Sequence, residues 1–263
     1  MPEFEAITPA SHGGKTWRAS PGYAFAAHDA VAALVMPEIP RACLYLPLAF
    51  AQVDDQYAPV AVQGLAPGQN LLVDAGGRWR ADYIPAAYRA YPFALAQAPD
   101  GQQVLCFDRA SGLLQDGPGG DGQSFFDADG QPAERITQIL QFLTQVQAGR
   151  AATRQACDAL RQHGLIAPWP VRIQNDAGAQ DVQGLFRIDE QALNELPADA
   201  LGAVRDAGAL ALAYCQLLSM QHLQRLGALA REHAIQQTSA AMRTPTGDLD
   251  LEFLNSGGTI KFH

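Results

Sequence analysis

Lysine is almost missing from this chain of 263 residues, which contains only Lys15 and Lys261. No run of basic residues occurs, and the formal net charge is −9 with a pI near 5.0. Nucleic acids and anionic membrane surfaces are both bound by clustered Lys and Arg side chains. The composition therefore predicts that no nucleic acid is a partner.

Long hydrophobic runs are also missing. The longest apolar-rich stretch, 207–220, has about 14 residues, fewer than the roughly 20 that a membrane span needs, and is typical of a buried helix. The first five residues are acidic and lack the apolar core of a secretory signal peptide. We therefore expect no membrane insertion and a cytoplasmic location.

Cysteine occurs four times, and no two cysteines form a C-x-x-C pair. Without export, the expectation is four reduced, mostly buried thiols and no metal site. The six histidines show no H-E-x-x-H pattern, and the glycines form neither a phosphate loop nor a dinucleotide-binding turn. The sequence predicts no cofactor, and it leaves open whether the protein is an enzyme.

The composition and its change along the chain predict an α+β fold. Apolar residues make up 48% and charged residues 17%, which is enough apolar material for a sizeable core. Residues 1–22 have the composition of an irregular arm, and residues 23–263 are expected to form a single α+β domain. Its β-rich N-terminal half packs with a helix-rich C-terminal half, with a candidate sub-boundary in the Gly- and Asp-rich loop at 111–130.

Local patterns place the expected elements. Period-two apolar residues and turn residues predict strands, the first of them an edge or bulged strand because it contains Pro47, at 42–52, 58–65, 70–75, 93–98 and 103–108, the last two as a hairpin. Helical spacing predicts helices at 132–146, 151–163, 199–223 and 225–237. The third is apolar nearly all round between 207 and 218, so it is expected to be central. Short strands are expected at 171–173, 184–188 and in the tail at 249–262.

The most specific feature is an aromatic block at 79–93, which reads W-R-A-D-Y-I-P-A-A-Y-R-A-Y-P-F. Aromatic and Arg side chains make binding hot spots, but aromatic side chains also fill cores. Two interpretations stay open. In one, the block is a buried loop in which Arg89 pairs with a carboxylate. In the other, it is a binding face that consists of Trp79, Tyr83, Arg89, Tyr91 and Phe93.

The block resembles the W-x(3)-Y-I-P-x(3)-R-x-Y-P-F signature of the SapC-like family of bacterial proteins. Segments such as 70–73 (N-L-L-V) and 184–190 (G-L-F-R-I-D-E) match in order, and the resemblance covers roughly residues 25–225. The family name implies an association with surface-layer proteins and serum resistance. Related genes often lie beside outer-membrane TonB-dependent receptors and flavin-dependent halogenase-like enzymes. The resemblance supplies no reaction, cofactor or catalytic residue.

Our leading hypothesis is a binding or accessory protein that recognises a peptide or protein partner through the aromatic and Arg-rich face. One alternative is an enzyme that modifies a peptide or small molecule near Arg89, for which the candidates are Glu38, His28, Asp74 and Asp82. Another alternative is a component of surface-layer assembly, which rests on the family name alone. The sequence leaves the oligomeric state open.

Overall fold

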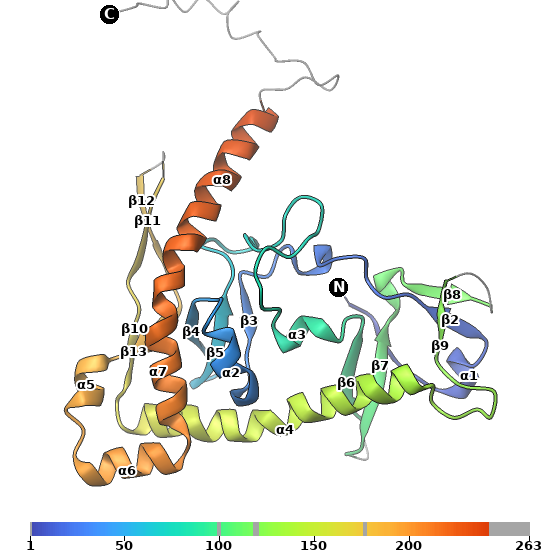
Figure 1. Ribbon diagram of the computed structural model, residues 1–263, viewed down its shortest axis with the longest axis horizontal. Coiled ribbons are helices and arrows are strands. Elements are labelled where there is room, and N and C mark those ends of the chain that lie inside the picture. The colour runs from blue at the N-terminus through green and yellow to red at the C-terminus, as the bar shows by residue number, and fades with distance from the viewer. Residues whose placement is uncertain (1, 99–100, 118–120, 176–177, 242–263) are drawn as a thin grey trace, which may run out of the picture.

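The computed structural model describes residues 2–98, 101–117, 121–175 and 178–241. Its strands lie mostly in the first half of the chain and its helices in the second (Figure 1). The predicted α+β class is therefore confirmed. The single domain expected for residues 23–263 stays a prediction.

A five-stranded antiparallel sheet holds the main core. In spatial order its strands are β10 (Ile166–Pro168), β13 (Leu185–Ile188), β4 (Leu48–Val53), β5 (Gln56–Val62) and β3 (Val31–Ala33). The central hairpin β4–β5 turns at Asp54 and Asp55, whose φ angles of 48° and 61° match the twist of a two-residue hairpin loop. The strand expected at 58–65 is β5, and it is confirmed.

The strand expected at 42–52 begins later, at Leu48. A short helix, α2 (Ile39–Ala42), and a turn precede it, so Leu44 is 61% exposed and belongs to no strand. The prediction of an edge or bulged strand was wrong. Pro47 lies just before the strand, where its missing N–H removes no ladder hydrogen bond, and β4 is central in the sheet.

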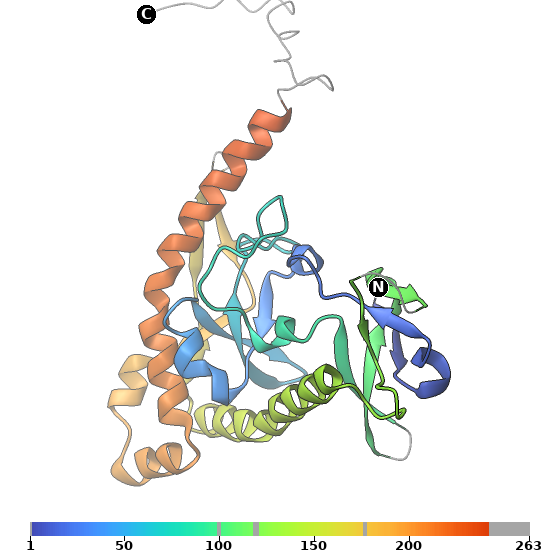
Figure 2. The same ribbon diagram turned by 45° about the vertical axis from the view of Figure 1, so that its right-hand side comes forward.

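Two smaller sheets join the N-terminus to the middle of the chain (Figure 2). One orders β1 (Phe4–Ala6), β7 (Gln103–Asp108) and β6 (Phe93–Gln97), and the other orders β8 (Leu114–Asp116), β2 (Lys15–Trp17) and β9 (Gln123–Ser124). The β6–β7 hairpin confirms its prediction. The prediction of an irregular arm at 1–22 was wrong, because this segment contains β1, α1 (Pro9–His12) and β2. The loop at 111–130 likewise contains β8 and β9, after a 3-10 turn η3 (Arg109–Ser111).

A second core lies under these small sheets and is built from aromatic rings. Trp17 meets Phe93 edge to face at 4.7 Å between ring centroids, and Phe107 meets Phe125 in the same way at 5.4 Å. All four rings are buried. Edge-to-face pairs of this kind add to the free energy of burial, which stabilises the six strands of these two small sheets.

Helix α4 (Glu134–Gln162) runs along both cores as one continuous helix of 29 residues (Figure 1). Two helices, at 132–146 and 151–163, were expected from the apolar spacing, and this was wrong. Gly149 is a site of close approach, since a Cβ there would lie 3.0 Å from Cδ of Pro37. The helix ends as expected at Gly164, whose φ is 67°.

The helix expected at 199–223 is divided. Gly208, with φ of 71°, separates α6 (Ala198–Asp206) from α7 (Ala209–Ser219), and a 3-10 turn η4 (Met220–His222) leads into α8 (Leu223–Ala241). Helix α7 was expected to be central, and its contacts with α2, α4, α6, β4 and β13 confirm this, although Tyr214 is 51% and Leu218 67% exposed. The predicted helix at 225–237 lies within α8 and is confirmed. No helix in the described part of the chain is long and apolar enough to cross a membrane.

The remaining elements complete the chain between α4 and α6. A hairpin of β11 (Val171–Asn175) and β12 (Gly178–Val182) projects beside the main sheet, and α5 (Glu190–Asn194) follows β13. The strand expected at 171–173 is therefore longer and pairs with β12, whereas the strand at 184–188 joins the main sheet as β13. The strands expected at 249–262 lie outside the described residues.

Candidate functional site

The aromatic block at 79–93 lies mostly inside the molecule. Trp79 and Tyr91 are half-buried, and the ring of Tyr91 stacks on Phe25 with centroids 3.7 Å apart. The other three aromatic residues of the block have 7% or less of their surface exposed: Tyr83, Tyr88 and Phe93. A partner cannot reach these three side chains, so they serve the core.

Glu38 ties the block to the rest of the core. It ends the 3-10 turn η2 (Met36–Glu38) and is 6% exposed. Three groups donate hydrogen bonds to its carboxylate: Val35 N at 3.0 Å, the Tyr83 hydroxyl at 2.8 Å and Ala86 N at 2.8 Å. Ala86 begins the short helix α3 (Ala86–Arg89). The Glu38 carboxylate therefore joins the η2 turn to Tyr83 and to the start of α3 in the block.

Arg89 completes this cluster from the outside. Its guanidinium lies 3.8 Å from Glu38 and 4.9 Å from the centroid of the Phe142 ring, and its side chain is 41% exposed. Burial, and then the neighbouring Glu38, raise the pKa of the Tyr83 phenol, so it remains a neutral donor. Two candidates of the enzyme hypothesis, Glu38 and Arg89, thus converge, but the carboxylate is enclosed and already saturated.

A second buried network holds the loop at 64–73. Asn70 donates from Nδ2 to the Ala26 carbonyl of the 3-10 turn η1 (Ala24–Ala26) and to Gln63 Oε1, each at 2.9 Å. The Tyr88 hydroxyl also lies 2.9 Å from Gln63 Oε1. Gly64 permits the loop to close, since a Cβ there would lie 1.8 Å from the Gln69 carbonyl oxygen. The block therefore supports this loop from behind.

The next part of the loop is a tight turn around Asp74. Its carboxylate accepts hydrogen bonds from Gly76 N, Arg78 N and Arg78 Nε, each at 2.9 Å. The backbone N–H of Arg78 is the main reason that the pKa of Asp74 lies below its ordinary value. The strand expected at 70–75 is wrong, because this turn leaves only a single bridge, from Val73 to Trp79. Gly77, with φ of 76°, closes this turn.

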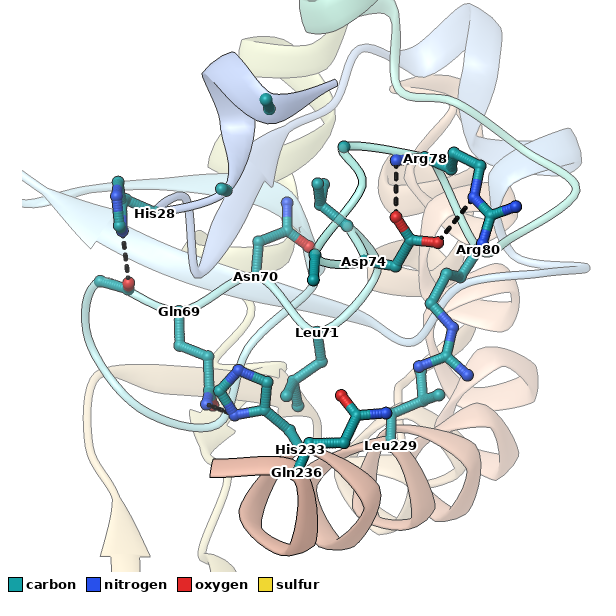
Figure 3. Close-up of a pocket in the computed structure, with 16 residues that line it drawn as sticks. His28, Gln69, Asn70, Leu71, Asp74, Arg78, Arg80, Leu229, His233 and Gln236 are labelled. Atoms are coloured by element: carbon teal, nitrogen blue, oxygen red, sulfur yellow. Dashed lines mark hydrogen bonds and ion pairs between the residues drawn. The ribbon is translucent and has the colours of Figure 1, made fainter. Parts of the chain in front are cut away.

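A cleft of about 760 Å³ separates this loop from α8 (Figure 3). Its volume is within the range of about 300–1,000 Å³ that ligand sites usually span. The loop contributes one wall and the middle turns of α8 the other. Leu71 and Leu229 are buried, and the accessible apolar side chains, called the apolar floor below, are Ala24, Ala27 and Val73. Its polar side chains include His28, Gln69, Asp74, Arg78, Arg80, His233 and Gln236.

The hydrogen bonds of the two histidines fix what each ring offers to a ligand. His28 Nδ1 lies 3.1 Å from the Gly68 carbonyl, which can only accept, so Nδ1 carries the proton and Nε2 is an acceptor in the neutral ring. His233 Nδ1 accepts from Gln69 Nε2 at 3.1 Å, so its Nε2–H is a donor. The Gln69–His233 bond also joins the two walls (Figure 3).

The carboxylates of the cleft are occupied, whereas the arginines keep unused donors. Arg78 is 85% exposed, and its Nε donates to Asp74. Arg80 donates from Nη2 to Glu232 at 2.8 Å. Each guanidinium has five N–H groups. Arg225 donates to the Arg80 carbonyl and adds a third positive charge beside them. A ligand of this cleft therefore meets mainly hydrogen-bond donors.

The predicted site residues divide between these places. His28 and Asp74 line the cleft, Glu38 and Arg89 belong to the buried cluster, and Asp82 is exposed away from both. None of the five residues predicted to bind a partner lines the cleft, namely Trp79, Tyr83, Arg89, Tyr91 and Phe93. Binding through the accessible ones, Trp79, Arg89 and Tyr91, stays a prediction.

Sequence reasoning missed the wall that α8 provides. Leu229, His233 and Gln236 are spaced i, i+4 and i+7, which places them on one helix face, and this signal is present in the sequence. The described residues contain no group of three or more His, Cys, Asp or Glu side chains that could hold a metal ion. All four cysteines are free, and three of them are buried: Cys43, Cys106 and Cys157.

Comparison with protein families decides where the chain belongs. A family model described as SapC matches residues 7–226. The chain is a member of the SapC family. No curated protein and no solved structure gives a significant match. The matched residues of this SapC protein include the aromatic block and the loop wall of the cleft, and they end before the wall formed by Leu229, His233 and Gln236.

Proposed function

We propose that this SapC protein is a binding protein that holds an extended segment of a peptide or protein partner in the cleft between the loop and α8. The observation that carries the proposal is the cleft itself, in which unused polar groups stand on both sides of an apolar floor. Extended peptides offer backbone groups for hydrogen bonding and alternate side chains for apolar pockets, and both are needed for specific binding.

The aromatic block has a supporting part in this proposal. Trp79 pairs with Val73 in the loop wall, and Tyr88 anchors the network of Gln63 and Asn70 beneath it. Rigid support of this kind lowers the entropy that binding would otherwise lose in ordering the loop. The block then determines the shape of the site, and the partner contacts the residues in front of it.

The proposal can be tested with random 12-residue peptides displayed on phage and selected on the full chain. Selected peptides are then measured by fluorescence anisotropy against Gln236→Trp, which fills the cleft from α8. The matched control is Gln141→Trp on the exposed face of α4. We expect Gln236→Trp to bind at least tenfold more weakly, which is about 1.4 kcal/mol, and the control to bind like the original chain.

Two results would overturn the proposal. One is that selection enriches no peptide. The other is that Gln236→Trp and Gln141→Trp bind the selected peptides equally well, since the peptides would then bind elsewhere.

We also propose that the protein works in the cytoplasm, as its cysteine usage supports. Its four thiols are free, and burial raises the pKa of Cys157 to about 12, so that this thiol stays protonated. Cell fractionation with an antibody against the chain tests the location. Recovery of most of the protein outside the cytoplasmic fraction would contradict it.

A further inference from the structure

The chain continues beyond α8 with a segment of unusual regularity. Residues 247–254 read G-D-L-D-L-E-F-L, so acidic residues at 248, 250 and 252 alternate with apolar residues at 249, 251 and 253. Successive side chains of an extended chain point to opposite sides. In that conformation, the segment would present one acidic edge and one apolar edge.

The cleft has the matching chemistry. Asp74 already accepts three hydrogen bonds and Glu232 already pairs with Arg80, so neither carboxylate needs another donor. Three arginines stand beside these two carboxylates, namely Arg78, Arg80 and Arg225, which gives a local excess of positive charge in a chain of net charge −9. An acceptor-rich edge fits the arginines, and an apolar edge fits the floor.

The segment can also reach the cleft. Gln236 lines the cleft and Ala241 ends α8, which is five residues or about 7.5 Å further along the helix axis. Six residues, 242–247, connect Ala241 to the segment and span up to roughly 20 Å when extended. Pro245 and Gly247 are residues that favour a change of chain direction.

We infer that residues 248–253 of this chain bind in its own cleft as an extended strand, with the acidic edge toward Arg78 and Arg80 and the apolar edge toward Val73 and Ala27. This inference rests on the proposed function and deepens it in two ways. The ligand class becomes a segment that alternates acidic and apolar residues. The tail becomes an internal competitor, which a partner segment of the same chemistry must displace.

Photo-crosslinking in the full chain tests the placement. The residue p-benzoylphenylalanine replaces Phe253, and irradiated protein is digested and analysed by mass spectrometry. We expect crosslinks to the apolar floor of the cleft, at Val73 or Ala27, within a single chain. The matched control carries the same residue at Phe262, which lies nine residues further along the tail, and is expected to give no preference for the cleft.

Competition provides the second measurement. The triple variant D248N/D250N/E252Q removes the acidic edge but keeps the length and apolar residues of the tail. We expect it to bind the phage-selected peptides about tenfold more tightly than the original chain, because they no longer compete with the tail. Unchanged affinity in this variant would overturn the inference.

The outcomes separate the two proposals. If selected peptides bind the cleft but Phe253 crosslinks elsewhere, or only between two chains, the inference fails and the proposed function stands. If Phe253 crosslinks into the cleft but no peptide binds even the triple variant, the tail fills the cleft as part of the fold. In that case the proposed function fails, and so does the inference that the tail competes with a partner.

Discussion

Replacing Glu38 by Gln should destabilise the protein more than any exposed charge substitution. Glu38 is 6% exposed, and its carboxylate accepts from two backbone N–H groups and from the Tyr83 hydroxyl. An amide of the same shape has only one accepting oxygen, and Val35 N and Ala86 N bond different oxygens. One of these two N–H groups must therefore face an amide N–H in the variant.

The magnitude follows from these contacts. A buried group that loses its partner costs about 1–3 kcal/mol, and hydrogen bonds to a charged acceptor exceed neutral ones by roughly 1 kcal/mol. The expected loss for Glu38→Gln is therefore about 2–4 kcal/mol. Arg89→Gln should cost under about 1 kcal/mol, because the guanidinium is 41% exposed and lies 3.8 Å from the carboxylate.

Urea unfolding, followed by circular dichroism and tryptophan fluorescence, measures both variants. Unchanged slopes in urea would show that the free energy of unfolding, and not the extent of unfolding, has changed. The reasoning is refuted if Glu38→Gln lies within about 0.5 kcal/mol of the original chain. It is also refuted if Arg89→Gln costs more than Glu38→Gln, because the ion pair would then outweigh the three hydrogen bonds.

Three further predictions concern packing, pH and thiol reactivity. Gly64→Ala should destabilise by at least about 3 kcal/mol in urea unfolding, because its Cβ would lie 1.8 Å from a carbonyl oxygen, whereas Gly202→Ala, with open space around it, should not destabilise. Burial raises the pKa of Tyr88, so its contribution to stability is complete below about pH 10 and is lost as the pH rises further. Tyr88→Phe should therefore reduce the alkaline fall in unfolding free energy by up to about 1.4 kcal/mol per pH unit, as measured by urea titrations between pH 9 and 11. Burial, and then Cys43, raise the pKa of Cys215 to about 11, so iodoacetamide at pH 8 should modify it roughly a hundredfold more slowly in the native than in the unfolded chain, by mass spectrometry; equal rates would contradict the burial.

Sequence patterns predicted the elements whose residues are close together in the chain. The β6–β7 hairpin and α8 follow from local turns and periodicity. The apolar pattern of α7 could not show that one narrow face, which carries Tyr214 and Leu218, stays exposed, because that depends on how the neighbouring helices and strands pack around it. The role of Gly149 is equally hidden from local patterns, because its close neighbour Pro37 lies more than a hundred residues away.

The site shows the same limit. The aromatic block was recognisable from its residue types, but its partner Glu38 lies 45 residues before Tyr83 and carries no local signal. The cleft joins Gln69 to His233 across 164 residues. Each wall has a readable pattern, a turn in one case and a helix face in the other. Their proximity is a property of the fold, and no spacing in the sequence encodes it.

The pairing of the N-terminal strands sets an order of events during synthesis. Phe4 pairs with Asp108, and Trp17 with Leu114 and Gln123, so these residues have no partner strand until about a hundred more residues have been made. At roughly 5–20 residues per second, this wait lasts about 5–20 s. Throughout this time Trp17 has no core to enter. Strands β1 and β2 are thus made well before they can pair.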